Sequence, residues 1–254
     1  MLEVEELIDD FEEWYYEVDE KIEETSKRFT YMIIGGIFGI FSVIIRICGD
    51  LIAIQLYPGY HPSTHMISFL SASRGHAYFT IGLIISSILI IPYYLAIALF
   101  FRNEFKKENK LILSSLYVSI ISAISLSLVG FFLELFTMIP IDLIYDLHGL
   151  FATIAFSCAV FAGVIMGYLI QKSDYFPHFF AYTCYIVAGV NLIFLFTWHA
   201  LLEWLASSLV IILQFTFGVY MIFKKVKSKL DLEEYQEELN KLLLNTILMK
   251  TIKK

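Results

Sequence analysis

The sequence contains 254 residues, of which 58% are hydrophobic, with a mean hydropathy of +0.71 and a formal net charge of −7. A soluble domain of this length averages closer to half apolar residues, so the composition argues against a soluble globular protein. The chain shows no basic stretch with interleaved aromatic residues, which argues against a nucleic-acid-binding protein.

The first predicted element is an acidic tail, residues 1–28, with twelve Asp or Glu residues against three Lys or Arg residues. Its apolar residues recur at helical spacing, which predicts an amphipathic cytoplasmic helix. In one interpretation this helix packs on the other tail or on the inner leaflet. In the alternative it is a docking site for a cytosolic protein partner. The apolar residues are Leu7, Phe11, Trp14, Val18 and Ile22.

Six long apolar runs follow, and runs of about 18 or more residues are typical of membrane spans. At 1.5 Å per residue, each run can cross the hydrocarbon layer of roughly 30 Å. The sequence therefore predicts an all-α, polytopic membrane protein with a six-transmembrane-helix bundle over residues 29–223. Pro92 lies within the second run and predicts a kink there. The predicted spans are 30–52, 77–101, 112–138, 147–170, 179–198 and 201–223.

The last predicted element is a second amphipathic cytoplasmic helix over residues 224–254. Its apolar positions again follow helical spacing, and its basic start at 224–229 could meet the acidic N-terminal tail. The apolar positions are Leu232, Tyr235, Leu239, Leu242 and Leu243.

The placement of Lys and Arg predicts the orientation of the bundle. If both termini are cytoplasmic, 16 of the 18 Lys and Arg residues lie in cytoplasmic segments. Only Arg46 and Arg74 lie in the first span and the outer loops. Such a bias is the signature of the positive-inside rule. We therefore expect both termini in the cytoplasm and the first and second outer loops on the extracytoplasmic side.

Ionisable residues in and beside the spans gather on this predicted outer side. Charged groups at membrane depth are costly, so they usually face a bundle interior and pair with one another. The sequence therefore predicts a polar cleft near the outer membrane boundary, in which at least four of these side chains meet. The candidates are Asp50, His65, Glu134, Asp146, His148, His199 and Glu203.

Two pairs of these residues share the i, i+4 spacing that places side chains on one helix face. Arg46 and Asp50 are predicted to form a structural ion pair, or alternatively to belong to a functional site. His199 and Glu203 span the start of the last helix, where helix capping and a functional role both remain open.

Alternatively, histidines on the predicted outer side could bind a metal ion. A divalent cation bound by three of them would suit a membrane-embedded, metal-dependent lipid hydrolase, with Glu203 or Glu134 as general base. The sequence has no HExxH, GxSxG or P-loop motif, so no reaction is predicted from a motif. The candidate metal ligands are His65, His148 and His199.

The cysteines are predicted to be free thiols, because each lies in an apolar run and they share no CxxC spacing. They are Cys48, Cys158 and Cys184.

Short motifs in the first outer loop resemble two families. The stretches LYPGY at 56–60 and STHMISFL at 63–70 resemble the loop of a prokaryotic membrane family of unknown function, DUF998. The same loop is similar to the DRAM/Frag/Sfk family, and that similarity continues at 148–152, 203–204 and 216–217. The chain departs from the eukaryotic pattern, because it has no loop cysteines and carries long charged tails. The resemblance implies six helices, cytoplasmic termini and duties related to membrane lipids.

The resulting hypothesis is an integral membrane protein whose outer polar cleft engages lipid headgroups, with membrane lipids as partners, no resident cofactor and no established catalysis. The rival hypotheses are the metal-dependent lipid hydrolase and a transporter of small molecules or ions. A transporter would need polar residues along the whole bundle. The cytoplasmic half of the predicted spans has few of them.

Overall fold

The computed structural model of the protein describes residues 30–134 and 141–224, and all regular structure in these residues is helical. The predicted tails, 1–28 and most of 224–254, lie outside the described residues. The helices that carry labels are η1 (Ile67–Ala72), α2 (His76–Glu104), η2 (Lys106–Glu108), α3 (Asn109–Glu134), α4 (Ile141–Lys172) and α5 (His178–Thr197). Two further helices, Thr30–Gln55 and Ala200–Lys224, are called the first span and the last span below.

Six helices of the described chain are long and apolar enough to cross a membrane, which confirms the predicted number of spans. Most of their ends agree with the predicted ones within a few residues. The largest difference is at α4, which begins at Ile141 directly after Pro140, six residues earlier than predicted. Proline is favoured around helix starts because its missing N–H and its fixed φ cost nothing there. The helical run through Pro92 is continuous.

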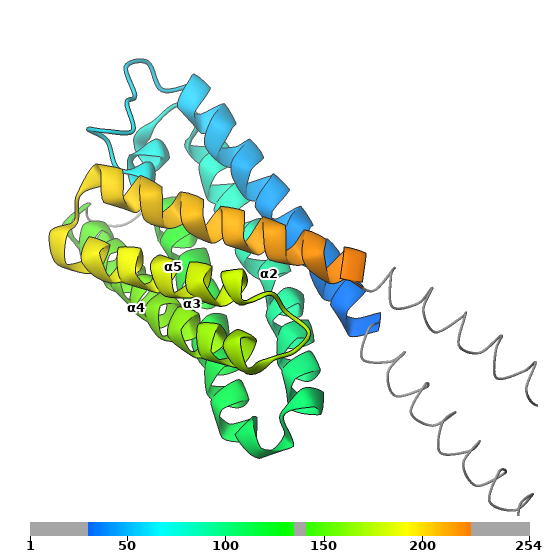
Figure 1. The fold of residues 1–254 in the computed structure, drawn as a ribbon. Helices are drawn as coiled ribbons and strands as arrows, with labels where there is room; N and C mark the ends of the chain where they lie inside the picture. The colour runs from blue at the N-terminus through cyan, green and yellow to red at the C-terminus, as the bar shows by residue number, and fades with distance from the viewer. Residues whose placement is uncertain (1–29, 135–140, 225–254) are drawn as a thin grey trace, which may run out of the picture.

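The six spans form a closed ring in chain order (Figure 1). α2 packs on α3, α3 on α4 and α4 on α5. A two-residue turn joins α5 to the last span. Trp198 in this turn has the left-handed backbone conformation, with φ of 47°. The described chain therefore begins and ends at the same end of the bundle. We call the end that carries residues 56–75 the loop end, and the other the opposite end.

The ring is closed by a seam between the first and last spans. A Cβ atom placed on Gly36 would lie 2.6 Å from the Gly218 carbonyl oxygen, and one placed on Gly218 would lie 3.1 Å from the Gly36 oxygen. Only glycines permit this backbone approach. Beside the seam, the Gln214 amide donates to the Gly39 carbonyl oxygen at 3.1 Å. The two ends of the chain thus complete one bundle.

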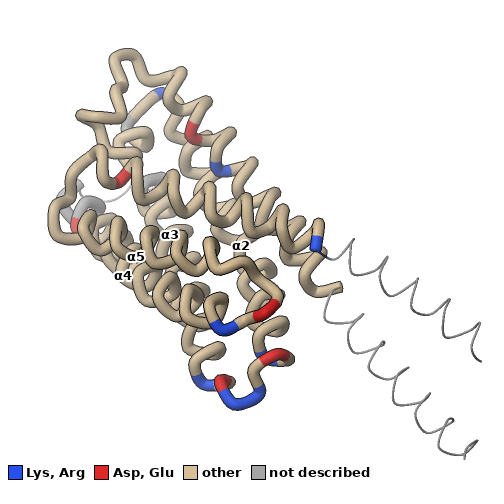
Figure 2. Tube along the Cα trace, in the orientation of Figure 1, with Lys and Arg blue, Asp and Glu red and all other residues tan. Residues whose placement is uncertain are grey.

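Charged and aromatic residues organise the opposite end. Figure 2 shows Lys, Arg, Asp and Glu gathered around the connection between α2 and α3 and the end of α4, whereas the middle of the bundle is almost free of charge. Lys172 pairs with Glu108 there at 2.9 Å. Just inside lies a buried aromatic cluster, in which ring centroids are about 5 to 6 Å apart. Its members include Phe100, Phe101, Phe176, Phe180 and Phe217.

Candidate functional site

A cavity of about 240 Å³ runs inside the ring and is lined by all six spans and by η1. Most of its wall is apolar. The polar part of the wall is mainly hydroxyl and amide groups, with one arginine, one histidine and one glutamate. These polar residues are Ser42, Arg46, Ser68, Ser86, Ser87, Tyr93, Tyr94, Ser119, Ser122, His148, Asn191, Glu203, Ser207 and Gln214.

The cavity ends before it reaches the opposite end of the bundle. Its deepest wall residues are apolar or aromatic and include Ile97, Ile170 and Phe217. Beyond them Phe100 and Phe101, in the aromatic cluster, are at most 1% exposed. The ionisable residues of the wall, Arg46, His148 and Glu203, therefore all lie toward the loop end, whereas the deepest part of the wall is apolar or aromatic.

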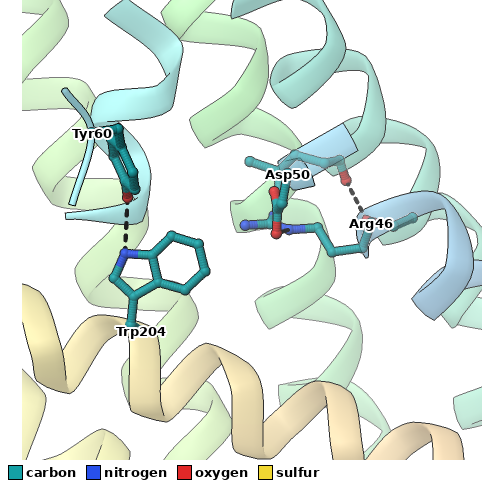
Figure 3. Close-up of polar contacts among 6 residues, drawn as sticks. Arg46, Asp50, Tyr60 and Trp204 are labelled. Carbon is teal, nitrogen blue, oxygen red and sulfur yellow. Dashed lines mark hydrogen bonds and ion pairs between the residues drawn. The ribbon is translucent and has the colours of Figure 1, made fainter. Parts of the chain in front are cut away.

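Arg46 projects from the first span into the wall of the cavity. Its Nε donates to Asp50 Oδ2 at 2.9 Å, one helical turn further along the same span (Figure 3). The guanidinium carbon also lies 5.1 Å from the centroid of the Phe79 ring, a cation–π distance. Asp50 does not line the cavity and lies behind Arg46, so its carboxylate orients the guanidinium without facing the cavity itself.

Glu203 holds the first loop over the loop end of the cavity. We call residues 56–75 the loop cap. The Ile67 N–H donates to Glu203 Oε2 at 2.7 Å. The first N–H groups of a helix have no partner within it, and a carboxylate supplies one. Glu203 is only 6% exposed, so the last span clamps η1 through a buried contact.

A second connection between the loop cap and the last span involves Trp204. Its indole Nε1 donates to the Tyr60 hydroxyl at 2.8 Å and to the His65 carbonyl oxygen at 3.2 Å (Figure 3). The Tyr60 hydroxyl in turn donates to the Met66 carbonyl oxygen at 2.9 Å. Burial raises the pKa of the Tyr60 phenol above its ordinary value, which keeps this donor protonated.

Hydrogen-bonding groups continue along the cavity wall below the loop cap. Asn191 is fully buried. Its amide nitrogen donates to the Val187 carbonyl oxygen at 2.7 Å, while its Oδ1 has no partner among the described residues. The Ser122 hydroxyl donates to the Ala155 carbonyl oxygen at 2.9 Å. Ser87 is 4% exposed and contributes a further hydroxyl to the wall.

The structure brings together only some of the residues predicted to form the site. His148 and Glu203 line the cavity, with Arg46, and Asp50 lies directly behind Arg46. Asp146 is exposed and does not line the cavity. α3 ends at Glu134, whose side chain lies outside the described residues. The cavity lies inside the bundle, deeper than the cleft that the sequence predicts at its outer boundary.

Two of the predicted histidines occupy other places. The His65 ring packs within the loop cap against Tyr57, Tyr60 and Phe69, at centroid distances of 5.5 to 6.3 Å. His199 is exposed, and its Nδ1 accepts from the Leu201 N–H at 3.3 Å at the start of the last span. This contact is the capping arrangement that the sequence left open.

Because of this separation, His65, His148 and His199 do not form a common metal site. Within residues 30–134 and 141–224, no three His, Cys, Asp or Glu side chains are grouped so that they could hold a metal ion. The three cysteines are unpaired, as predicted, and only Cys184 lines the cavity.

The main feature that the sequence analysis missed is the set of uncharged polar residues on the cavity wall. Ser119 and Ser122 line the cavity, and Ser115 lies one turn before Ser119 on the same face of α3 without lining it. All three are at most 7% exposed. The spacing of these serines indicates a polar interior face of α3, whereas the prediction of the site rested on charged and histidine side chains.

The fold and the cavity together define a six-span membrane protein with a mostly apolar internal chamber, which carries a few polar and ionisable groups and is capped by its first loop. The sequence matches the family described as "Protein of unknown function (DUF998)" over residues 40–220, and the chain belongs to this prokaryotic membrane family. The likeness to the DRAM/Frag/Sfk family stays a resemblance. No curated protein and no solved structure matches the chain.

Proposed function

We propose that the protein binds a membrane amphiphile, with its apolar chain in the part of the cavity away from the loop end and its polar headgroup beneath the loop cap. The supporting observation is the cavity itself, whose wall is mostly apolar and carries its ionisable residues, Arg46, His148 and Glu203, toward the loop end. Ligand sites in proteins have this character, mostly apolar with a few well-placed polar groups.

The mostly apolar wall of the cavity suits a hydrocarbon chain, which a membrane supplies in abundance.

The closed opposite end favours binding over passage through the bundle. A transport pathway needs a route to both sides, whereas the cluster around Phe100, Phe101 and Phe176 fills the bundle below the cavity. The proposal is therefore of a binding protein and includes no reaction.

The orientation of the site is part of the proposal. All the Lys and Arg residues of the described chain except Arg46 and Arg74 lie at or near the opposite end, and the positive-inside rule assigns that end to the cytoplasm. Both termini would then be cytoplasmic, and the cavity would take its ligand from the extracytoplasmic leaflet. A role in membrane lipid homeostasis, which the family resemblance implies, agrees with this arrangement. The tails remain candidate contacts for a cytosolic protein.

Filling the cavity tests the proposal. Ala159 lines the cavity on α4, whereas Val164 on the same helix is 49% exposed on the outside of the bundle. The protein carrying Ala159→Phe should retain at least fivefold less co-purified lipid than the wild type. The amount is measured by mass spectrometry of organic extracts after exhaustive detergent exchange. The matched variant Val164→Phe should retain the wild-type amount. Equal lipid content in all three proteins would refute binding in this cavity.

A further inference from the structure

We propose that the ligand is a monoacyl glycerophosphate or a close chemical relative, whose anionic group is bound by Arg46 and whose free hydroxyl is bound by Asn191. This inference rests on the proposed function and assigns the chemical class of the amphiphile. Three features of the cavity wall support it.

The first feature is the charge of the wall. Arg46 is the only Lys or Arg residue among the described residues that line the cavity. An arginine has five N–H donors, and among residues 30–134 and 141–224 the hydrogen bonds of the Arg46 guanidinium commit only Nε, to Asp50. Its side chain is 13% exposed, so the remaining donors are sheltered from bulk water but not enclosed by protein. Planar guanidinium groups bind phosphate and carboxylate oxygens in a bidentate manner.

The carboxylates near Arg46 do not occupy these donors. Asp50 holds Nε from behind and does not line the cavity. Glu203 accepts a hydrogen bond from the Ile67 N–H in the loop cap. The guanidinium is therefore held in place, and its unused edge is available to an anionic group.

The second feature is an unused acceptor. Asn191 is fully buried, lines the cavity and has no donor to its Oδ1 among the described residues. A buried acceptor without a partner costs about 1–3 kcal/mol, so a ligand hydroxyl that donates to it would gain affinity. Arg46 lies nine residues before the end of the first span at Gln55, and Asn191 six residues before the end of α5 at Thr197. At 1.5 Å per residue they lie roughly 14 and 9 Å inside the loop end, in the same half of the bundle.

The third feature is the size of the space. The cavity has a volume of about 240 Å³, and its wall includes Ile97 and Ile170 on the side away from the loop end. This volume suits a single hydrocarbon chain better than two. One anionic group, one hydroxyl and one chain together fit a monoacyl glycerophosphate.

The test compares three probes with the same chain, namely oleoyl lysophosphatidic acid, oleate and mono-oleoylglycerol, on delipidated full-length protein by native mass spectrometry. The first has an anion and a hydroxyl, the second an anion only, and the third hydroxyls only. The wild type should bind lysophosphatidic acid about ten- to a hundredfold more tightly than mono-oleoylglycerol, as expected for a charge-assisted hydrogen bond.

The double variant Arg46→Gln/Asp50→Asn should lose this preference. Replacing both partners avoids leaving a buried, unpaired Asp50, and retained binding of mono-oleoylglycerol would show that the variant is folded. Arg74→Gln is the matched control, because Arg74 is exposed and does not line the cavity. Asn191→Leu should weaken the binding of lysophosphatidic acid about two- to tenfold while leaving the binding of oleate unchanged.

The outcomes separate the two proposals. If mono-oleoylglycerol binds the wild type as tightly as lysophosphatidic acid, or if the double variant keeps the preference, the assignment to Arg46 is wrong and the binding function stands. If Asn191→Leu weakens all three probes equally, the hydroxyl contact is wrong. If no probe binds the wild type, the proposed function fails together with this inference.

Discussion

At the scale of single residues, the polar groups at the loop end divide into those that face the cavity and those that hold the loop cap. Arg46 and His148 line the cavity, whereas Trp204 and His65 act between the loop cap and the last span. Glu203 belongs to both groups, because it lines the cavity and accepts the Ile67 N–H. A change at the cap should therefore alter access to the cavity without altering its wall.

Trp204→Phe tests this division. The substitution keeps an aromatic ring and removes the N–H that donates to the Tyr60 hydroxyl and the His65 carbonyl oxygen. A net hydrogen bond contributes about 0.5–1.5 kcal/mol, so amide hydrogen exchange in residues 61–70 should accelerate about two- to tenfold.

Trp198→Phe is the control for this measurement. Trp198 contacts Phe194 through its ring at a centroid distance of 5.3 Å, and no hydrogen bond of its indole is seen among the described residues. The exchange of residues 61–70 should not change. If Trp204→Phe leaves the exchange at the wild-type rate as well, the indole does not secure the cap.

The separation in sequence decides which of these contacts could be predicted. The Arg46–Asp50 pair was predicted because i, i+4 neighbours share a helix face whatever the rest of the fold does. The contact of Ile67 with Glu203 joins positions 136 residues apart, and nothing local in the sequence specifies it. Nothing local in the sequence specifies where His65 and His199 lie relative to each other. Both are histidines near the same end of the bundle, which suggested a common site, but the fold places them apart.

At the scale of helices, the seam between the first and last spans leaves little room for larger side chains. Its two glycines allow a backbone approach that a side chain would block. Small residues at helix interfaces are the usual means of close packing in membranes, where no hydrophobic effect drives helices together. The cavity depends on this seam, because the ring encloses a space only if its two ends meet.

Gly36→Ala should therefore destabilise the bundle. The added Cβ would lie 2.6 Å from the Gly218 carbonyl oxygen, and overpacking of this kind costs about 1–3 kcal/mol. Thermal unfolding in detergent should show a clear decrease in Tm. In Gly189→Ala the Cβ would meet nothing within 4 Å, so this variant should unfold at or above the wild-type temperature. If the Tm of Gly36→Ala equals that of the wild type, the first and last spans can accommodate the added Cβ atom at little cost.

At the scale of the whole molecule, the spans could be predicted and the cavity could not. Each span is an apolar run of 20 to 29 residues, and its length is fixed by the thickness of the bilayer. Hydropathy does not distinguish a serine that faces the interior from one that faces lipid. The polar groups on the cavity wall could therefore be recognised only from the structure, which places Ser87, Ser122 and Asn191 around one cavity.

Accessibility labelling checks the orientation of the molecule. Ser63 in the loop cap and Lys107 at the opposite end are both exposed. In a background without the three native cysteines, Ser63→Cys should react with a membrane-impermeant maleimide added to intact cells. Lys107→Cys should react only after the membrane is permeabilised, because the positive-inside rule assigns its end to the cytoplasm. The reverse pattern would overturn the assigned topology.

The location of the Arg46–Asp50 pair within a single helix has a consequence for the synthesis of the protein. The first span leaves the ribosome long before the last span, so for most of translation the seam at Gly36 has no partner and the ring is open. An unpaired charge in the bilayer is costly throughout that interval. Because Asp50 follows Arg46 by one helical turn, the charge is neutralised as soon as the first span is helical. The insertion of the first span is thus independent of helices that have not yet been made, and the guanidinium turns toward a cavity only when the nascent chain is complete.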